Sequence, residues 1–594
     1  MTAPHWLHRG IEGLRRKPLR IVALSAALFV LWCVWSLGSL AISTKQSLDA
    51  TNEAKSTVLS GDATAARNSV STAIAKAVDA RSTVTAAPLS WIAKVPGIGR
   101  PIVAAQGAVD VLEQTLSDVV QPIAASDLVH ALRQDAAGPG IDIAALKKGL
   151  PALDAARVAA ERIDARAATI ETTGFLPPLD RKLNKAKSQS HQLREALDLA
   201  HQLGPVLPAL LGEGREVRYL MVFQTNSESR GTGGLMGGTA MLTVHDGAIT
   251  IDKSASNLGL GIDNFKSINL GKEFNFNYGR WDATTNWQNA NFSANFPYAA
   301  QIWRSIWMQS GGGKVDGVIA TDPIALSYLL EATGPIRLAS GEEIRSDNVA
   351  AITLNEAYFR YPAQSQQEAR KEYLQSISRG VINAVTAPTT SKSAAAKAVL
   401  KALDDSRLMM WSANPKVQAL LGDTVLGHAV PNDSAPYANV VLNNGAGGKL
   451  DYYMDRKISY SAGSCTGPTR ESTVTVTLTN NAPKSTKYPS YIYGRRTPDT
   501  KYAGPPGTNR SIVMVYGTKG AQLKSFTIDA KTAFEFTGSE LGHPLFAAVV
   551  ITEPGQTKTL QYRLIEPTAP GAARVPAQPL TRAADIKVAV PTCK

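Results

Sequence analysis

Residues 21–42 are almost wholly apolar and carry no charged side chain. This segment is long enough to cross the ~30 Å hydrocarbon core of a bilayer as a helix. Basic side chains precede it, whereas only Lys45 follows closely, and this asymmetry predicts a cytoplasmic N-terminus. A cleaved signal peptide and a buried helix are the alternatives. We therefore expect a cytoplasmic tail over residues 1–20, a single-pass anchor over residues 21–42 and an extracytoplasmic remainder at the cell membrane.

Size and charge narrow the partners that the chain can have. Its 594 residues are too many for one hydrophobic core, so several folded units are expected. The net charge of +13 comes from 62 basic and 49 acidic residues, with no long basic run beyond the N-terminal cluster. Nucleic acid is therefore not an expected partner, and membrane lipid or an anionic envelope polymer is favoured.

Three successive composition patterns predict a multidomain chain. Residues 43–210 are rich in alanine with apolar residues at helical spacing, which predicts an extracytoplasmic helical bundle or stalk. Residues 215–430 alternate short strand patterns with helical ones, which predicts an α/β core domain around a central sheet. Residues 437–594 contain repeated strand patterns such as 471–478, which predict a β-sandwich.

The cysteines agree with an oxidising compartment. Cys33 lies within the predicted anchor, which leaves Cys465 and Cys593 in the last third of the chain. One disulfide between them is the expected pairing, and two unpaired thiols are the alternative. The three cysteines and eight histidines show no zinc-ligand spacing.

The region 219–251 is the part of the sequence that suggests a ligand. An apolar run leads into the polar cluster Asn226, Glu228 and Arg230, then into five glycines, then into a second apolar run. This pattern predicts a strand, a glycine-rich loop and a second strand. Such a loop exposes backbone N–H groups to an anion. Close packing of the glycines, with no ligand, is the structural alternative.

Further charged residues complete a candidate site. Arg230, Arg360 and Arg370 are candidates to hold phosphate oxygens, because guanidinium groups bind them in pairs. Glu228, Asp316 and Asp322 are candidate ligands for Mg²⁺. Three of these residues have a structural alternative: Arg370 on a solvated helix face, Asp316 in a turn, and Asp322 capping a helix.

Several short motifs carry a resemblance to a bacterial family known only as domain of unknown function 4012. They are Asn226-x-Glu228-x-Arg230-x-x-Gly233-Gly234, Val315-Asp316 with Asp322-Pro323, Gly334-Pro335, and Asn443-Asn444-Gly445 with Lys449. Members of that family look like single-pass envelope proteins, so the resemblance implies a location and no activity.

The order of elements is also similar to that of LytR-CpsA-Psr phosphotransferases, which move glycopolymers from a polyprenyl-pyrophosphate carrier to peptidoglycan. Taken with the candidate site above, this similarity gives Glu228, Arg230 and Asp316 as the expected catalytic residues and Mg²⁺ as a possible cofactor. The expected ligand-binding residues are Asn226, Gly233, Gly234, Arg360 and Arg370. The sequence departs from that family where Asn226 and the glycines replace aspartates, which weakens the metal site.

Two hypotheses follow. In the first, the α/β domain of a membrane-anchored envelope protein binds a lipid-linked or polymeric ligand that carries phosphate or pyrophosphate. A polyprenyl-phosphate-linked glycan or a cell-wall polymer is the expected partner, and glycopolymer transfer of the LytR-CpsA-Psr type is the expected reaction. In the second, the protein is a non-catalytic scaffold that organises protein partners in an envelope complex.

Overall fold

The computed structural model describes residues 62–131, 140–251, 255–256, 265–387, 390–484, 487–494, 504–533 and 536–593, with parts of 32–58. Its contacts divide the chain into two compact units. The first unit consists of residues 1–135 and 141–205, and the second of residues 136–140 and 206–594.

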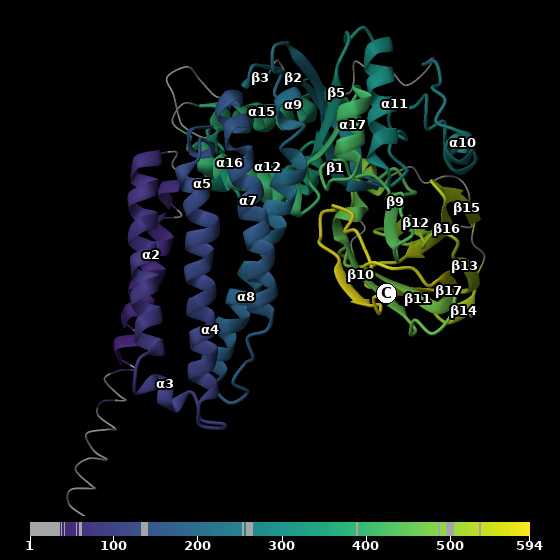
Figure 1. Cartoon of the computed structure of the whole chain (residues 1–594). Helices are drawn as coiled ribbons and strands as arrows, with labels where there is room; N and C mark the ends of the chain where they lie inside the picture. Colours follow the sequence, from purple (N-terminus) through teal and green to yellow (C-terminus); the bar gives the residue numbers. More distant parts are fainter. Residues whose placement is uncertain are drawn as a thin grey trace, which may run out of the picture. The chain divides into compact units, whose positions relative to one another are not determined.

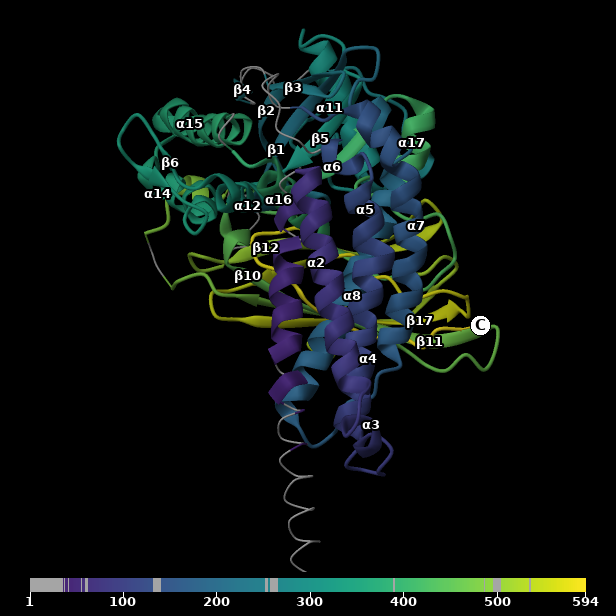
Figure 2. The ribbon, with the colours of Figure 1, turned by 60° about the vertical axis from the view of Figure 1, so that its left-hand side comes forward.

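The first unit is helical, as its alanine-rich sequence predicts. The long helices α2 (Ala63–Thr85), α4 (Arg100–Gln114), α7 (Ile143–Ala168) and α8 (Pro177–Leu203) run side by side (Figure 1, Figure 2). The short elements are α3 (Leu89–Ile92), η1 (Thr115–Val120), α5 (Gln121–Ala125) and α6 (Leu128–Ala131). Asp62 caps α2 by accepting hydrogen bonds from the backbone of Thr64 and Ala65.

Alanine side chains allow these helices to pack closely. On α2 the buried positions Ala66, Ala73, Ala77 and Ala80 recur at helical spacing. A methyl side chain loses no rotamer freedom and lets neighbouring backbones approach. The alanine stripe is therefore the packing face of the bundle.

The predicted membrane anchor, residues 21–42, lies mostly outside the described residues. Among the helices that the structure does describe, none combines the length and apolarity that crossing a bilayer requires. The anchor remains a prediction from sequence.

The second unit begins with a six-stranded sheet in the order β3-β2-β1-β5-β8. Its strands are β1 (Val217–Arg230), β2 (Gly233–His245), β3 (Ala248–Ile251), β4 (Ala255–Ser256), β5 (Gly317–Thr321) and β8 (Met409–Ser412). β1 pairs in parallel with β5 and antiparallel with β2, while β4 pairs with β2. The helices around it include α11 (Phe296–Gln309), α12 (Pro323–Thr333), α15 (Gln367–Thr386) and α16 (Lys392–Asp404). The predicted α/β character is confirmed.

Smaller elements connect these strands and helices. The helical ones are α9 (Leu207–Leu210), α10 (Lys272–Tyr278), η3 (Gly279–Trp281), α13 (Val349–Ala351), η4 (Ile352–Glu356), α14 (Ala357–Arg360), η5 (Gln364–Gln366) and α17 (Pro415–Gly422). β6 (Ile336–Arg337) and β7 (Glu343–Ile344) form a separate two-stranded ladder.

The prediction of a glycine-rich loop between two strands is wrong. β1 continues through the polar cluster to Arg230, a turn at Gly231 and Thr232 reverses the chain, and β2 begins at Gly233. A Cβ at Gly234 would lie 2.4 Å from the carbonyl carbon of Thr225, so the glycine permits close approach of the two strands. Composition suggested a loop because glycine is rare inside strands, whereas here it allows tight pairing.

Two further sheets follow in the same unit. One has the order β15-β16-β12-β9, and the other has the order β14-β13-β17-β11-β10-β18. Their strands are β9 (Asn439–Asn444), β10 (Met454–Ala462), β11 (Thr469–Asn480), β12 (Asn509–Tyr516), β13 (Gln522–Ile528), β14 (Lys531–Thr532), β15 (Phe536–Glu540), β16 (His543–Thr552), β17 (Thr557–Pro567) and β18 (Asp585–Ala589). The short helices η6 (Leu450–Tyr453) and α18 (Ser490–Tyr493) lie between strands in sequence. One core, with Val440 and Val513 from the first sheet and Val474 and Leu560 from the second, joins the two.

The predicted cysteine pairing is confirmed. The sulfur atoms of Cys465 and Cys593 lie 2.07 Å apart, and the bond closes a loop with a sequence separation of 128. It ties the end of the chain to the segment before β11.

The main core of the second unit crosses the predicted boundary between residues 430 and 437. It includes Phe296 and Trp303 of α11 together with Met514 and Tyr516 of β12. The hydroxyls of Tyr278 and Tyr516 are hydrogen-bonded at 2.8 Å. The aromatic-rich stretch before α11 therefore supplies core side chains that connect the first sheet to β12.

Candidate functional site

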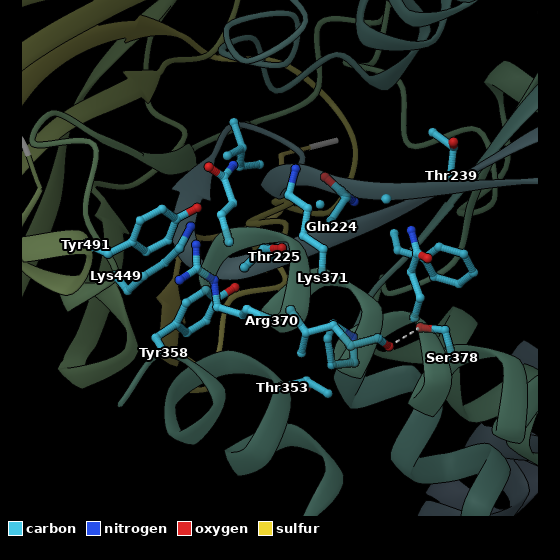
Figure 3. Close-up of a pocket in the computed structure, with 18 of the residues that line it drawn as sticks. Gln224, Thr225, Thr239, Thr353, Tyr358, Arg370, Lys371, Ser378, Lys449 and Tyr491 are labelled. Atoms are coloured by element: carbon cyan, nitrogen blue, oxygen red, sulfur yellow. Dashed lines mark hydrogen bonds between the residues drawn. The ribbon is translucent and has the colours of Figure 1, made fainter. Parts of the chain in front are cut away.

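A cavity of about 440 Å³ opens in the second unit, beside the middle of the β1–β2 hairpin. Strand residues Phe223–Thr225 and Gly237–Thr239 form one wall, and α12, α14 and α15 contribute others (Figure 3). Its volume falls within the range usual for small-molecule sites.

Three basic side chains line this cavity: Arg370 and Lys371 from the start of α15, and Lys449 from the segment after β9. Among the described residues, no aspartate or glutamate lines it. Figure 3 shows Arg370 and Lys449 beside the rings of Tyr358 and Tyr491, with Lys371 extending toward Gln224. The wall therefore carries concentrated positive charge, which favours an anionic ligand.

Arg370 is 1% exposed, and several contacts hold its guanidinium in place. Its guanidinium stacks 3.9 Å from the ring centre of Tyr491 and 5.5 Å from that of Tyr358. Nη1 donates a hydrogen bond to the carbonyl of Tyr361 at 2.7 Å, while Nη2 has no hydrogen-bond partner among the described residues. A buried guanidinium with an unused donor is suited to bind an anion.

Lys449 is fixed by a carboxylate behind the cavity wall. Its Nζ donates to Glu228 Oε2 at 2.5 Å, and both side chains are almost fully buried. Burial opposes the charge of Lys449, but Glu228 outweighs it and raises the pKa of the ammonium. Lys449 therefore stays protonated.

Lys371 differs from its neighbours in how readily it loses a proton. Burial, together with the positive charges of Arg370 and Lys449, lowers the pKa of Lys371 to about 8. An anionic ligand would remove part of this repulsion. Lys371 is therefore the basic group of the cavity whose charge responds to pH near neutrality.

The rest of the wall is a mixture of apolar and amide side chains. The apolar ones include Phe223, Leu235, Trp287, Leu326 and Leu374. The amides are Gln224, Gln288, Gln364, Gln367 and Gln375. The cavity thus combines a basic region, an apolar region and neutral hydrogen-bonding groups.

Two of the predicted catalytic residues lie beneath the cavity instead of lining it. Arg230 Nη2 is 3.7 Å from Glu228 Oε1. Arg230 also donates to the carbonyls of Gln288 and Ser229 and lies over the ring of Phe292. Burial lowers the pKa of Arg230. These contacts make Glu228 and Arg230 a buried support for Lys449.

The third predicted catalytic residue is far from the other two. Asp316 accepts a hydrogen bond from the backbone of Arg218 and pairs with Arg215. Arg218 and Glu228 are ten positions apart on β1, which corresponds to about 30 Å along an extended strand. Asp316 therefore cannot share a site with Glu228.

The predicted ligand-binding residues separate in the same way. Arg370 lines the cavity, but Arg360 is partly exposed and pairs with Glu342 at 2.9 Å. Asn226 is fully buried and donates to Asp322 and to the carbonyl of Pro579. Neither Gly233 nor Gly234 lines the cavity, and the N–H of Gly234 is taken by the side chain of Gln224.

The carboxylates proposed for Mg²⁺ do not fit such a site. Glu228 binds Lys449, Asp316 binds Arg215, and Asp322 binds Arg407 while capping α12. Across the described part of the chain, no group of three aspartate, glutamate, histidine or cysteine residues is placed to hold a metal ion. No metal-dependent step is derived from these residues.

Sequence reasoning missed Lys449, Tyr358 and Tyr491 as parts of the site. Lys449 is separated from Glu228 by 221 positions, so no local pattern connects them. The available signal was the run from Asn443 to Lys449, which belonged to the family-like motifs. Lys371 directly follows Arg370 in the sequence, but only Arg370 was predicted to bind the ligand.

Comparison with known proteins supports one of the two resemblances. Residues 215–358 match the model of a family described as "Protein of unknown function (DUF4012)". This stretch contains β1, β2, β5 and α12, and ends at Tyr358 in the cavity wall. Searches of curated proteins and of solved structures found no match. The similarity to LytR-CpsA-Psr phosphotransferases remains a prediction.

Proposed function

We propose that the second unit binds a ligand carrying phosphate or pyrophosphate in the cavity beside the β1–β2 hairpin. The observation that carries this proposal is the convergence of Arg370, Lys371 and Lys449 on a wall that no described carboxylate lines. The buried Nη2 of Arg370 supports it, because it leaves a donor beside the cavity with no acceptor among the described residues. Phosphate oxygens accept several such charge-assisted hydrogen bonds at once.

The apolar part of the wall favours a ligand in which the phosphate is joined to an apolar group. Leu235, Leu326 and Leu374 would contact a hydrocarbon, which releases water from apolar surface on both sides. We therefore propose a polyprenyl-phosphate-linked glycan or a related cell-wall polymer precursor as the ligand class. The protein would act at the outer face of the cell membrane, anchored by residues 21–42.

Binding of the phosphate-bearing ligand is better supported than transfer of a glycopolymer. Glycopolymer transfer needs a group that accepts the proton of the attacking hydroxyl. No described carboxylate lines the cavity, and Glu228 is already bound to Lys449. The order of elements supports a core like that of the LytR-CpsA-Psr phosphotransferases with a C-terminal β-sandwich, but shared architecture does not carry activity with it.

The test is the affinity of the purified full chain for inorganic pyrophosphate and for geranylgeranyl pyrophosphate, measured by calorimetry in detergent. Lys371→Gln removes one cavity charge while keeping a similar length, and we expect about a tenfold loss of affinity for both probes. The matched control is Arg360→Gln, which removes a positive charge paired with Glu342 outside the cavity.

The outcomes separate the two hypotheses. Tighter binding of the prenylated probe than of inorganic pyrophosphate supports the lipid-linked ligand class. Equal loss in the Lys371 and Arg360 variants would show a diffuse charge effect and reject this cavity. If the wild-type protein binds neither probe, the scaffold hypothesis replaces the ligand-binding one.

A further inference from the structure

One end of the helical unit exposes large apolar side chains. This end, the tip, consists of α3, residues 93–103 and the connection between α7 and α8, residues 169–176. Ile98 is 68% exposed, and Trp91 and Phe175 are each 55% exposed. Figure 1 shows α3 at one end of the long helices, away from α5. Scattered apolar residues are common on surfaces, whereas a cluster of this kind marks a contact site.

The two connections of the tip form one continuous surface. Phe175 lines the same shallow hollow as Pro96, Ile98 and Pro101. Val95 and Val103 line a neighbouring hollow. The exposed apolar residues are thus grouped, although the two connections are far apart in sequence.

Basic side chains accompany the apolar ones. Lys94 and Arg100 are exposed at the tip, and Glu171 is the exposed acidic residue in the same hollow. Arg166, which also lines it, is paired with the buried Asp110. Apolar and aromatic side chains next to basic ones are the composition of protein surfaces that lie in a lipid headgroup region.

A contact inside the first unit indicates which partner covers the tip. The rings of Trp91 and Trp32 meet edge to face, with centroids 5.6 Å apart. Trp32 belongs to residues 21–42, the predicted membrane anchor, and Leu40 from the same segment packs against the core that contains Leu89. The tip therefore contacts described residues of the predicted anchor. Tryptophan is enriched at the interface between a membrane and water.

We propose that the tip is a membrane-contact surface that inserts Trp91, Ile98 and Phe175 into the headgroup region of a bilayer containing anionic phospholipid. The inference rests on residues 21–42 being an anchor and is independent of the ligand proposed for the cavity. Its consequence is mechanical: a second contact beside the anchor would hold the helical unit at a fixed height above the membrane.

The test uses the full chain with Cys33→Ser, in which Cys465 and Cys593 remain joined. Ile98→Cys is labelled with an environment-sensitive fluorophore, and the protein is reconstituted into phosphatidylcholine–phosphatidylglycerol vesicles. Insertion by 5–10 Å would bring the label within reach of spin-labelled lipid, so we expect roughly twofold quenching. The matched control is Val158→Cys, because Val158 is 44% exposed and lies on α7 about 15 Å before its end.

Two outcomes would overturn the proposal. One is equal quenching at positions 98 and 158. The other is a blue-shifted emission at position 98 that lipid-borne spin labels do not quench, which would mean that protein covers the tip. A second variant, Lys94→Glu with Arg100→Glu, tests the anionic headgroups independently of the apolar residues. We expect it to abolish the difference in quenching between these vesicles and phosphatidylcholine vesicles, and an unchanged difference would contradict the role of the anionic lipid.

Discussion

Lys449 and Glu228 form a buried ion pair across 221 positions of sequence, with 2.5 Å between Nζ and Oε2. The pair connects the far end of β1 to the segment after β9. It therefore fixes the position of one cavity cation relative to the sheet that forms the cavity wall.

Removing one partner of this pair should destabilise the second unit. Glu228→Gln leaves Lys449 buried without its carboxylate, and we expect a loss of about 3 kcal/mol in the free energy of unfolding. Urea unfolding measures this value. The double variant Glu228→Gln with Lys449→Met should recover part of the loss, since it removes the ammonium that Glu228→Gln leaves buried without its carboxylate, while Arg230 still loses its contact with Glu228. If the double variant is as unstable as the single one, the unpaired ammonium of Lys449 is not the cause of the loss.

Anion binding in the cavity should weaken as pH rises through about 8. The pKa of Lys371 is lowered to about 8, so this side chain is an ammonium below that pH and a neutral amine above it. A bound anion favours the ammonium, hence affinity for inorganic pyrophosphate should be greater at pH 7 than at pH 9. Calorimetry across this range measures the trend. Lys371→Gln controls for titration of the probe itself, and an identical profile in that variant would exclude Lys371 as the cause.

The free energy of unfolding should decrease as pH rises from about 4.5 to about 7, because of Glu540. Burial raises the pKa of this carboxyl from 4.5 to about 7, so the folded protein keeps a proton that the unfolded chain releases. The protonated state stabilises the fold below this window, and the contribution, about 3 kcal/mol, is lost as pH rises through 7. Thermal unfolding at several pH values reports it. Glu540→Gln should flatten this dependence, whereas an unchanged slope would assign it to other groups.

The disulfide should contribute substantially to the stability of the C-terminal sheets. Cys465 and Cys593 close a loop with a sequence separation of 128, and loop-closure entropy predicts about 4–5 kcal/mol. Cys465→Ser with Cys593→Ser, compared with the oxidised protein in urea unfolding, measures this difference. Wild-type protein treated with a reducing agent should match the double variant. A midpoint unaffected by either treatment would mean that packing alone holds the end of the chain.

Local sequence patterns were sufficient for most of the secondary structure in the second unit. The alternating strand and helix patterns predicted over residues 215–430 correspond to β1, β2 and β5 and to helices such as α15. Apolar periodicity reports burial directly, and burial decides helix and strand positions. The glycine-rich stretch was wrongly predicted to be a loop, because composition alone does not distinguish a loop from tightly paired strands.

The candidate site depended on contacts that local pattern does not encode. Arg370 and Arg360 look equivalent in sequence, yet one stacks on Tyr491 in the cavity and the other pairs with Glu342 outside it. Which arginine lines the cavity is decided by long-range packing of α15 against segments more than a hundred residues away.

Composition, periodicity and chain position predicted the helical and α/β character of the two units, the cysteine pair and Arg370 as a ligand-binding candidate. These features act locally. Folding brings Lys371 and Lys449 to the same cavity as Arg370 and leaves Glu228 and Arg230 buried behind its wall. The physical reason is that electrostatic environment depends on distance in space, and folding brings together charges that are hundreds of positions apart in the chain.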